Sequence, residues 1–129
     1  MTYKFTILGR LDGLNNYIAA MNSHYHRGAA LKKSNQGTCE WSISNQLRGV
    51  KIKNPVRIIY RWFEPNKRRD LDNISSGGRK VIQDALVARG VLGGDGWKQI
   101  VGFSDEFFID RECPRIEIDI VEVKNWKNL

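Results

Sequence analysis

Long apolar runs, cysteine and proline are all scarce in this chain of 129 residues. No stretch is apolar enough to suggest a transmembrane helix, and the first residues lack the apolar core of a signal peptide. We therefore expect a cytoplasmic protein that does not enter the membrane. The two cysteines, Cys39 and Cys113, match no metal-ligand spacing and are expected to be free thiols. No repeat, low-complexity tract or linker divides the chain, so we expect a single domain over residues 1–129.

Acidic residues are also in the minority. The chain has 14 Asp and Glu against 21 Lys and Arg, which gives a net charge of +7 and a pI near 9.6. This pI passes the threshold typical of nucleic-acid-binding domains. Excess positive charge alone fits DNA, RNA or an anionic membrane, so the charge indicates a polyanionic partner without choosing among the three.

Hydrophobic periodicity predicts four strands and three helices. The strands are expected at residues 3–7, 56–63, 97–109 and 115–123, and the helices at residues 14–25, 29–48 and 73–90. The order β-α-α-β-α-β-β does not alternate strictly, which favours the α+β class with one mixed sheet of about four strands packed by helices. Residues 124–129 are expected to form a loose tail or a short docking segment.

Two further expectations concern packing. If the strands at 56–63 and 115–123 are neighbours, Arg57 and Arg61 would lie opposite Glu117 and Asp119. Gly77-Gly78 would weaken the first turns of the helix at 73–90, because glycine costs roughly 1 kcal/mol relative to alanine in a helix.

A short charged segment after the second strand is the most informative part of the chain. Lys67, Arg68 and Arg69 run directly into Asp70 and Asp72, with one residue between the two acids. Cations attract a phosphate backbone, whereas carboxylates repel it. A metal ion reconciles the two when both lie near a polyanion, so the segment indicates phosphodiester chemistry rather than passive binding.

The spacing of Asp70 and Asp72 suits a divalent cation if the segment is extended, because alternate side chains then point to one side. Two carboxylates about 4 Å apart repel by roughly 4 kcal/mol at an effective dielectric of 20. Mg²⁺ removes that repulsion and takes one or two carboxylates, together with waters and substrate phosphate oxygens. The alternative is structural, since acids before a helix are ordinary caps. An EF-hand calcium loop is excluded, because Ile74, Ser75 and Val81 occupy its key positions.

Asp95 is a candidate third ligand in the loop Gly93-Gly94-Asp95-Gly96. An aspartate in a glycine-rich turn is more often a turn residue than a ligand, so Asp95 gains weight only from the acids upstream. Trp97 beside it is the one tryptophan that we consider as a DNA contact through base stacking. Packing in the core is the interpretation that we favour for it.

These residues together resemble the RusA family of Holliday-junction resolvases, small basic endonucleases often carried by phages and prophages. The resemblance lies in a block of about 35 residues and extends, in element order and length, along nearly the whole chain. The matching segments are Lys67-Arg68-Arg69-Asp70-Leu71-Asp72-Asn73, Asp84-Ala85-Leu86, Gly90-Val91-Leu92, Asp95 and Gln99-Ile100. The resemblance implies a Mg²⁺-dependent nuclease, with Mn²⁺ as a possible substitute, that cuts four-way DNA junctions in recombination and repair.

The resemblance also implies roles for single residues. Asp70, Asp72 and Asp95 would hold the metal at the scissile phosphate. The residues implied to lie at the DNA are Lys67, Arg68, Arg69, Asn73, Asn15 and Asn16; the last two contact DNA or only cap a helix. No small-molecule cofactor is implied. Resolving a junction requires nicks in two strands related by two-fold symmetry, so a chain with one site is expected to act as a homodimer.

One position departs from the family pattern. Well-known members carry a lysine one helical turn after the second motif aspartate, where this chain has Ser76. Lys80 lies one further turn along, and we expect it to reach back toward the phosphate and stabilise the transition state as a catalytic residue. Two alternatives stay open. One is a non-catalytic, phage-derived protein that binds branched DNA; the other is a nuclease for flaps or RNA.

Overall fold

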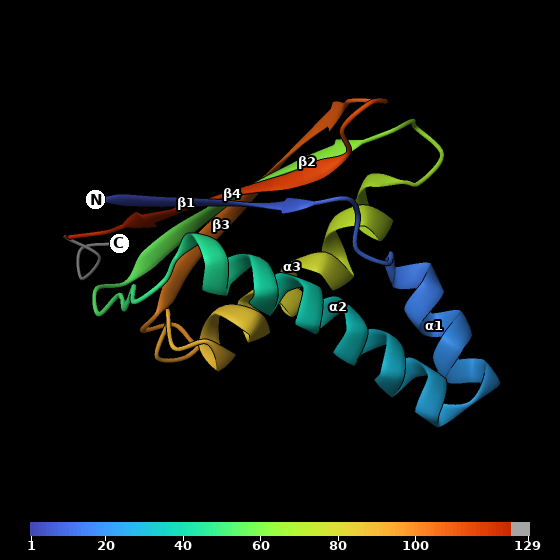
Figure 1. The fold of residues 1–129 in the computed structure, drawn as a ribbon, viewed down its shortest axis with the longest axis horizontal. Coiled ribbons are helices and arrows are strands. Elements are labelled where there is room, and N and C mark those ends of the chain that lie inside the picture. Colours follow the sequence, from blue (N-terminus) through green and yellow to red (C-terminus); the bar gives the residue numbers. More distant parts are fainter. Residues whose placement is uncertain (125–129) are drawn as a thin grey trace.

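The computed structural model describes residues 1–124, so most of the expected tail at 124–129 lies outside the described residues. The predicted fold class and element order are confirmed in one mixed sheet and three helices. The elements are β1 (Thr2–Leu8), α1 (Leu14–Ser23), α2 (Tyr25–Gln46), β2 (Val56–Glu64), α3 (Leu71–Ala88), β3 (Ile100–Ile109) and β4 (Arg115–Glu122). Helices α2 and α3 lie together on one side of the sheet (Figure 1).

The sheet has the strand order β1-β4-β2-β3. The β1–β4 and β4–β2 pairs are antiparallel, and β2 pairs with β3 in parallel. A parallel pair needs a crossover, which α3 supplies. Along β2, Val56, Ile58, Tyr60 and Trp62 are buried at every second position and form the centre of the core. Because α3 follows β2 directly, the charged segment lies where the sheet ends and the helix begins.

Helix α3 packs through a continuous face of buried residues, which are Ile74, Ser75, Gly78, Val81, Ile82, Ala85 and Leu86. Gly78 has a specific reason to be glycine. A Cβ there would lie 2.7 Å from Cη2 of Trp62, which is itself buried. The cost of glycine in a helix is therefore offset by the close approach of the helix to the central strand.

The first two helices divide at His24 rather than in the gap expected between residues 25 and 29. His24 is extended, with φ −166° and ψ 133°, and its Nδ1 accepts a hydrogen bond of 3.1 Å from the backbone N–H of His26. The predicted apolar stripe of α1 is not in the core, since Ile18 and Met21 are 49% and 59% exposed. The reason is position, because α1 projects beyond the end of the sheet (Figure 1).

The edge and cross-strand contacts explain two surface features of the sheet. The side-chain amide of Gln46 bonds both backbone groups of Thr6, at 2.7 and 2.6 Å, and so seals part of the free edge of β1. Arg61 lies opposite Glu117 and forms an ion pair of 2.9 Å with Asp119, as expected. The expectation for Arg57 is wrong, because the register places it opposite Val121.

Two smaller expectations can be scored within residues 1–124. The third strand begins at Ile100 rather than at 97, because the backbone N–H of Gln99 turns back to the carbonyl of Gly96 at 3.0 Å. Cys39 and Cys113 are free thiols, as expected. No helix in this part of the chain is long and apolar enough to cross a membrane.

Candidate metal and nucleic-acid site

Asp70 and Asp72 lie at the start of α3 in different backbone states. Asp70 is the N-cap residue, extended at φ −68° and ψ 155°, whereas α3 has already begun at Leu71. The condition under which both carboxylates would point to one side, an extended Asp-Leu-Asp segment, is therefore not met, and α3 begins two residues before the expected residue 73. Both acids are exposed, and the side chain of Asp70 makes no capping hydrogen bond. Within residues 1–124 neither carboxylate has a hydrogen-bond or ion-pair partner. Asp70 therefore occupies the N-cap position without the capping bond, and Asp72 lies in the first helical turn, where an acid suits the macrodipole.

Lys67 and Arg68 precede these acids and are both exposed. Among the described residues neither side chain takes part in an ion pair. Lys67 and Asp70 also line a hollow of about 400 Å³ between the start of α3 and the end of β3, where Phe107 and Phe108 form its apolar side. Within residues 1–124, two cations and two carboxylates without ion-pair partners thus lie close together in the chain, and one of each, Lys67 and Asp70, lines the hollow.

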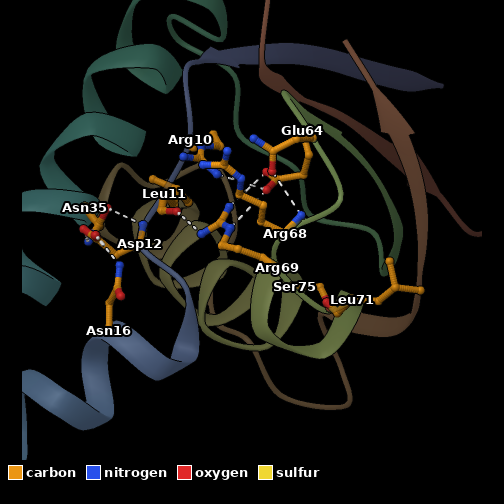
Figure 2. Close-up of polar contacts among 11 residues, drawn as sticks. Arg10, Leu11, Asp12, Asn16, Asn35, Glu64, Arg68, Arg69, Leu71 and Ser75 are labelled. Atoms are coloured by element: carbon orange, nitrogen blue, oxygen red, sulfur yellow. Dashed lines mark hydrogen bonds and ion pairs between the residues drawn. The ribbon is translucent and has the colours of Figure 1, made fainter. Parts of the chain in front are cut away.

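Arg69 has a different environment from its neighbours, as Figure 2 shows. Its guanidinium makes two hydrogen bonds to Glu64, at 3.0 and 2.9 Å, and a third of 3.1 Å to the backbone carbonyl of Leu11. Glu64 is only 5% exposed and also accepts a bond of 3.3 Å from Arg10. A buried carboxylate requires such partners, so Arg69 ties the β2–α3 loop to the β1–α1 loop.

Asn73 joins the starts of α3 and α1. Its Oδ1 accepts a hydrogen bond of 2.7 Å from the backbone N–H of Asn15. Gly13 permits this approach, since a Cβ there would lie 2.7 Å from the same oxygen. Asn16 donates a bond of 3.1 Å to Asp12. Asn73 therefore joins the start of α3 to the start of α1 through Asn15, whereas the side chain of Asn16 bonds Asp12 just before its own helix.

Asp95 and Lys80 form a separate group further along α3. Lys80 Nζ lies 2.7 Å from Asp95 Oδ2 and 3.1 Å from Asp84 Oδ1. The hydrogen bond to Asp95, and then that to Asp84, raises the pKa of Lys80 above its ordinary value. The same bond from Lys80 lowers the pKa of Asp95. Lys80 is thus held as a cation, and its ammonium pairs with Asp84 rather than reaching back toward the start of α3.

The expected convergence of Asp70, Asp72 and Asp95 is absent from residues 1–124. In that part of the chain no group of three or more His, Cys, Asp or Glu side chains is placed to hold a metal ion. Lys80 follows Asp72 by eight residues, which is about 12 Å along a helix, and Asp95 lies beside Lys80. The structure brings Asp70 and Asp72 together with Lys67, Arg68 and Asn73, and it leaves Asp95 with Lys80.

The donor set at the start of α3 nevertheless suits Mg²⁺. One or two carboxylates are the usual protein contribution to a magnesium site, whose other ligands are waters and phosphate oxygens. Asp70 and Asp72 meet that requirement in number and chemistry. Asp95 does not contribute here, because its carboxylate is already neutralised by Lys80.

Sequence reasoning missed the residues that hold the site in place. Glu64 could have been identified from the sequence, because it follows Trp62 by two residues on a strand whose alternate residues are buried. A buried carboxylate needs a partner such as an arginine. The role of Asp105 was harder to infer from the sequence. It accepts a bond of 2.9 Å from Trp62 Nε1 and pairs with Arg79, which joins α3 to β3.

No protein-family model matches this chain, and no curated protein matches it either.

Proposed function

We propose that this protein is a metal-dependent endodeoxyribonuclease that acts on branched DNA, with the four-way junction as its substrate. The observation that carries the proposal is the pair of exposed carboxylates at the start of α3, Asp70 and Asp72, which within residues 1–124 make no hydrogen bond or ion pair. Lys67 and Arg68 stand beside them without ion-pair partners within residues 1–124. This combination fits a polyanionic substrate better than it fits a stabilising role.

The roles follow from position. Asp70 and Asp72 would hold Mg²⁺, or Mn²⁺ in its place, which when bound polarises a phosphoryl group and lowers the pKa of a water. Lys67 and Arg68 would bind the phosphates on either side. Lys80 lies about 12 Å from Asp72 along α3 and is paired with Asp95 and Asp84, so we assign it no role at the scissile phosphate. The RusA-like motif supports the same assignment of the two acids.

The proposal includes a homodimer, because two nicks related by two-fold symmetry need two copies of one site. It also places the protein in the cytoplasm, in DNA recombination and repair. Sedimentation equilibrium of the full chain measures its oligomeric state directly. A chain that stays monomeric when bound to junction DNA would contradict the homodimer.

A nicking assay tests the proposal. A synthetic four-way junction, a linear duplex and a flap are incubated with the protein in Mg²⁺ and in EDTA. We expect paired nicks in the junction with Mg²⁺ only. Asp72→Asn should lower the nicking rate by about 100-fold or more, since losing even a residue that supports a metal ligand costs 10- to 100-fold. The variant should bind the junction at least as tightly, because it removes charge that repels phosphate.

Glu122→Gln is the matched control, because it removes one negative charge from the strand end opposite the motif, where Glu122 pairs with Val56. It should nick like the unmodified protein. Equal cutting of all three substrates would instead indicate a nuclease of a different specificity.

A non-catalytic protein that binds branched DNA is the second candidate. The pairing of Asp95 with Lys80, together with the lack of a three-acid group among residues 1–124, favours it. Junction binding with a steep salt dependence, but without nicking in either Mg²⁺ or Mn²⁺, would select this alternative.

A further inference from the structure

An aromatic hollow lies at the start of β3, away from the motif acids. It has a volume of about 180 Å³ and is lined by Trp97, Ile100, Val101, Gly102 and Phe103. Trp97 is 90% exposed and Phe103 is 50% exposed. The expectation that Trp97 packs in the core is wrong, because Trp97 lies exposed in the turn closed by the bonds from Gln99 and Ile100 to the carbonyl of Gly96.

Positive charge lies near this hollow on both faces of β3, with Arg57 on the outer face of the sheet and Arg79 on the face toward α3. The guanidinium of Arg57 lies against Gly102, where a Cβ would approach Nη1 to 2.5 Å. Arg79 lies over the ring of Phe103, with 4.8 Å from its Cζ to the ring centroid. Lys98 follows Trp97 directly in the chain. Within residues 1–124, neither Arg57 nor Lys98 has an ion-pair partner.

The nearest acids are already neutralised. Asp95 pairs with Lys80, and Asp105 pairs with Arg79. None of the described residues that line the hollow is acidic. The hollow therefore offers aromatic surface for a flat ligand and free cations for a negatively charged one, and these two properties occur together in a nucleotide strand.

We infer that this hollow binds an unstacked nucleobase, with Trp97 and Phe103 contacting the base and Arg57 and Lys98 contacting the adjoining phosphates. The inference rests on the proposed function, because an enzyme that opens the centre of a branched DNA exposes unpaired bases there. Stacking on an aromatic side chain is tolerant of sequence, since every base has a π face.

Binding of a fluorescent oligothymidine in EDTA tests the inference without any cleavage. Replacing one stacked aromatic residue by alanine costs about 1–3 kcal/mol per base, which is a roughly 5- to 150-fold loss of affinity. We expect Trp97→Ala to show a loss in this range and Trp97→Phe to recover part of it. Trp41→Ala is the matched control, because Trp41 lies on α2, is 71% exposed and does not line the hollow.

An abasic oligonucleotide of the same length separates base stacking from phosphate attraction. The unmodified protein and Trp97→Ala should bind it equally. Equal affinity of both proteins for oligothymidine, an equal loss in Trp41→Ala, or no binding of oligothymidine at all would overturn the inference. The proposed function is judged separately. If the protein nicks junctions and Trp97→Ala leaves oligothymidine binding unchanged, only this inference is refuted. If Trp97→Ala weakens binding but the protein never nicks a junction, only the proposed nuclease activity is refuted.

Discussion

Replacing Arg69 by alanine is expected to destabilise the protein, whereas replacing its neighbour Arg68 is expected to weaken DNA binding alone. Both arginines belong to the same basic segment, and the sequence assigns them the same role. In the structure, Arg69 makes three hydrogen bonds to Glu64 and Leu11, while the side chain of Arg68 has no ion-pair partner within residues 1–124. Comparing the two variants therefore distinguishes an arginine that stabilises the fold from one whose side chain is available to bind a phosphate.

The magnitude follows from burial. The side chains of Arg69 and Glu64 are 18% and 6% exposed, so their pairing is only weakly screened by solvent. Removing one partner of a buried pair typically costs 3–5 kcal/mol. Arg10 remains 3.3 Å from Glu64 and compensates in part, so we expect a loss of about 2–4 kcal/mol. For a chain of this size that corresponds to a fall in Tm of roughly 6–20 °C.

Arg68→Ala should change the free energy of unfolding by no more than about 0.5 kcal/mol, which is typical of an exposed position. It should instead reduce the slope of log K against log salt by about 0.9, the value for one phosphate contact. Urea denaturation gives the first quantity, and junction binding in EDTA over a salt series gives the second. An Arg69→Ala protein as stable as the unmodified one would refute the reasoning, as would an Arg68→Ala protein with an unchanged salt slope.

Further predictions concern packing and charge on α3. Gly78→Ala should destabilise the protein by about 1–2 kcal/mol in urea, because overpacking against Trp62 costs 1–3 kcal/mol and exceeds the gain in helix propensity. Gly37→Ala on α2 meets open space and should stabilise by up to about 1 kcal/mol, so the same sign for both changes would refute this account. The carboxyl of Asp95 should titrate below its ordinary pKa of 3.8, and Lys80→Met should return it toward that value. Because the folded-state pKa is lowered, the contribution of the pair to folding stability is present at neutral pH and is lost as the pH falls below 3.8. Carbon NMR of the Asp95 carboxyl group measures its titration midpoint. A midpoint at the ordinary value would contradict this prediction.

The fold was readable from the sequence because its signals are local and repeated. Alternation along Val56–Glu64 and the three-to-four-residue spacing on α3 each predict an element without reference to the rest of the chain. The break between α1 and α2 at His24 could not be predicted in the same way. It depends on a single side chain that accepts a bond from the backbone two residues later, and an imidazole gives no general signal for a break.

The site was readable only in part, because its geometry depends on contacts between distant residues. The charged segment identified the acids, but local sequence treats Arg68 and Arg69 alike. Their difference arises from the burial of Glu64 and the nearby carbonyl of Leu11. Similarly, Asp95 matched a family pattern in sequence, but only the tertiary structure shows that Lys80 engages it. The hydrophobic character of Trp97 also led to a wrong prediction of burial, because Trp97 lies exposed in the turn at Gly96.

Binding of Mn²⁺ to the protein, followed by NMR, tests the central claim most directly. Paramagnetic Mn²⁺ broadens the amide signals of residues close to the bound ion, and this readout requires neither DNA nor catalysis. We predict selective broadening at Asp70, Leu71 and Asp72 at low Mn²⁺ concentration, and its loss in the variant that combines Asp70→Asn with Asp72→Asn. Absence of broadening at the start of α3, or the same broadening in the double variant, would contradict the claim that these two carboxylates form the metal site.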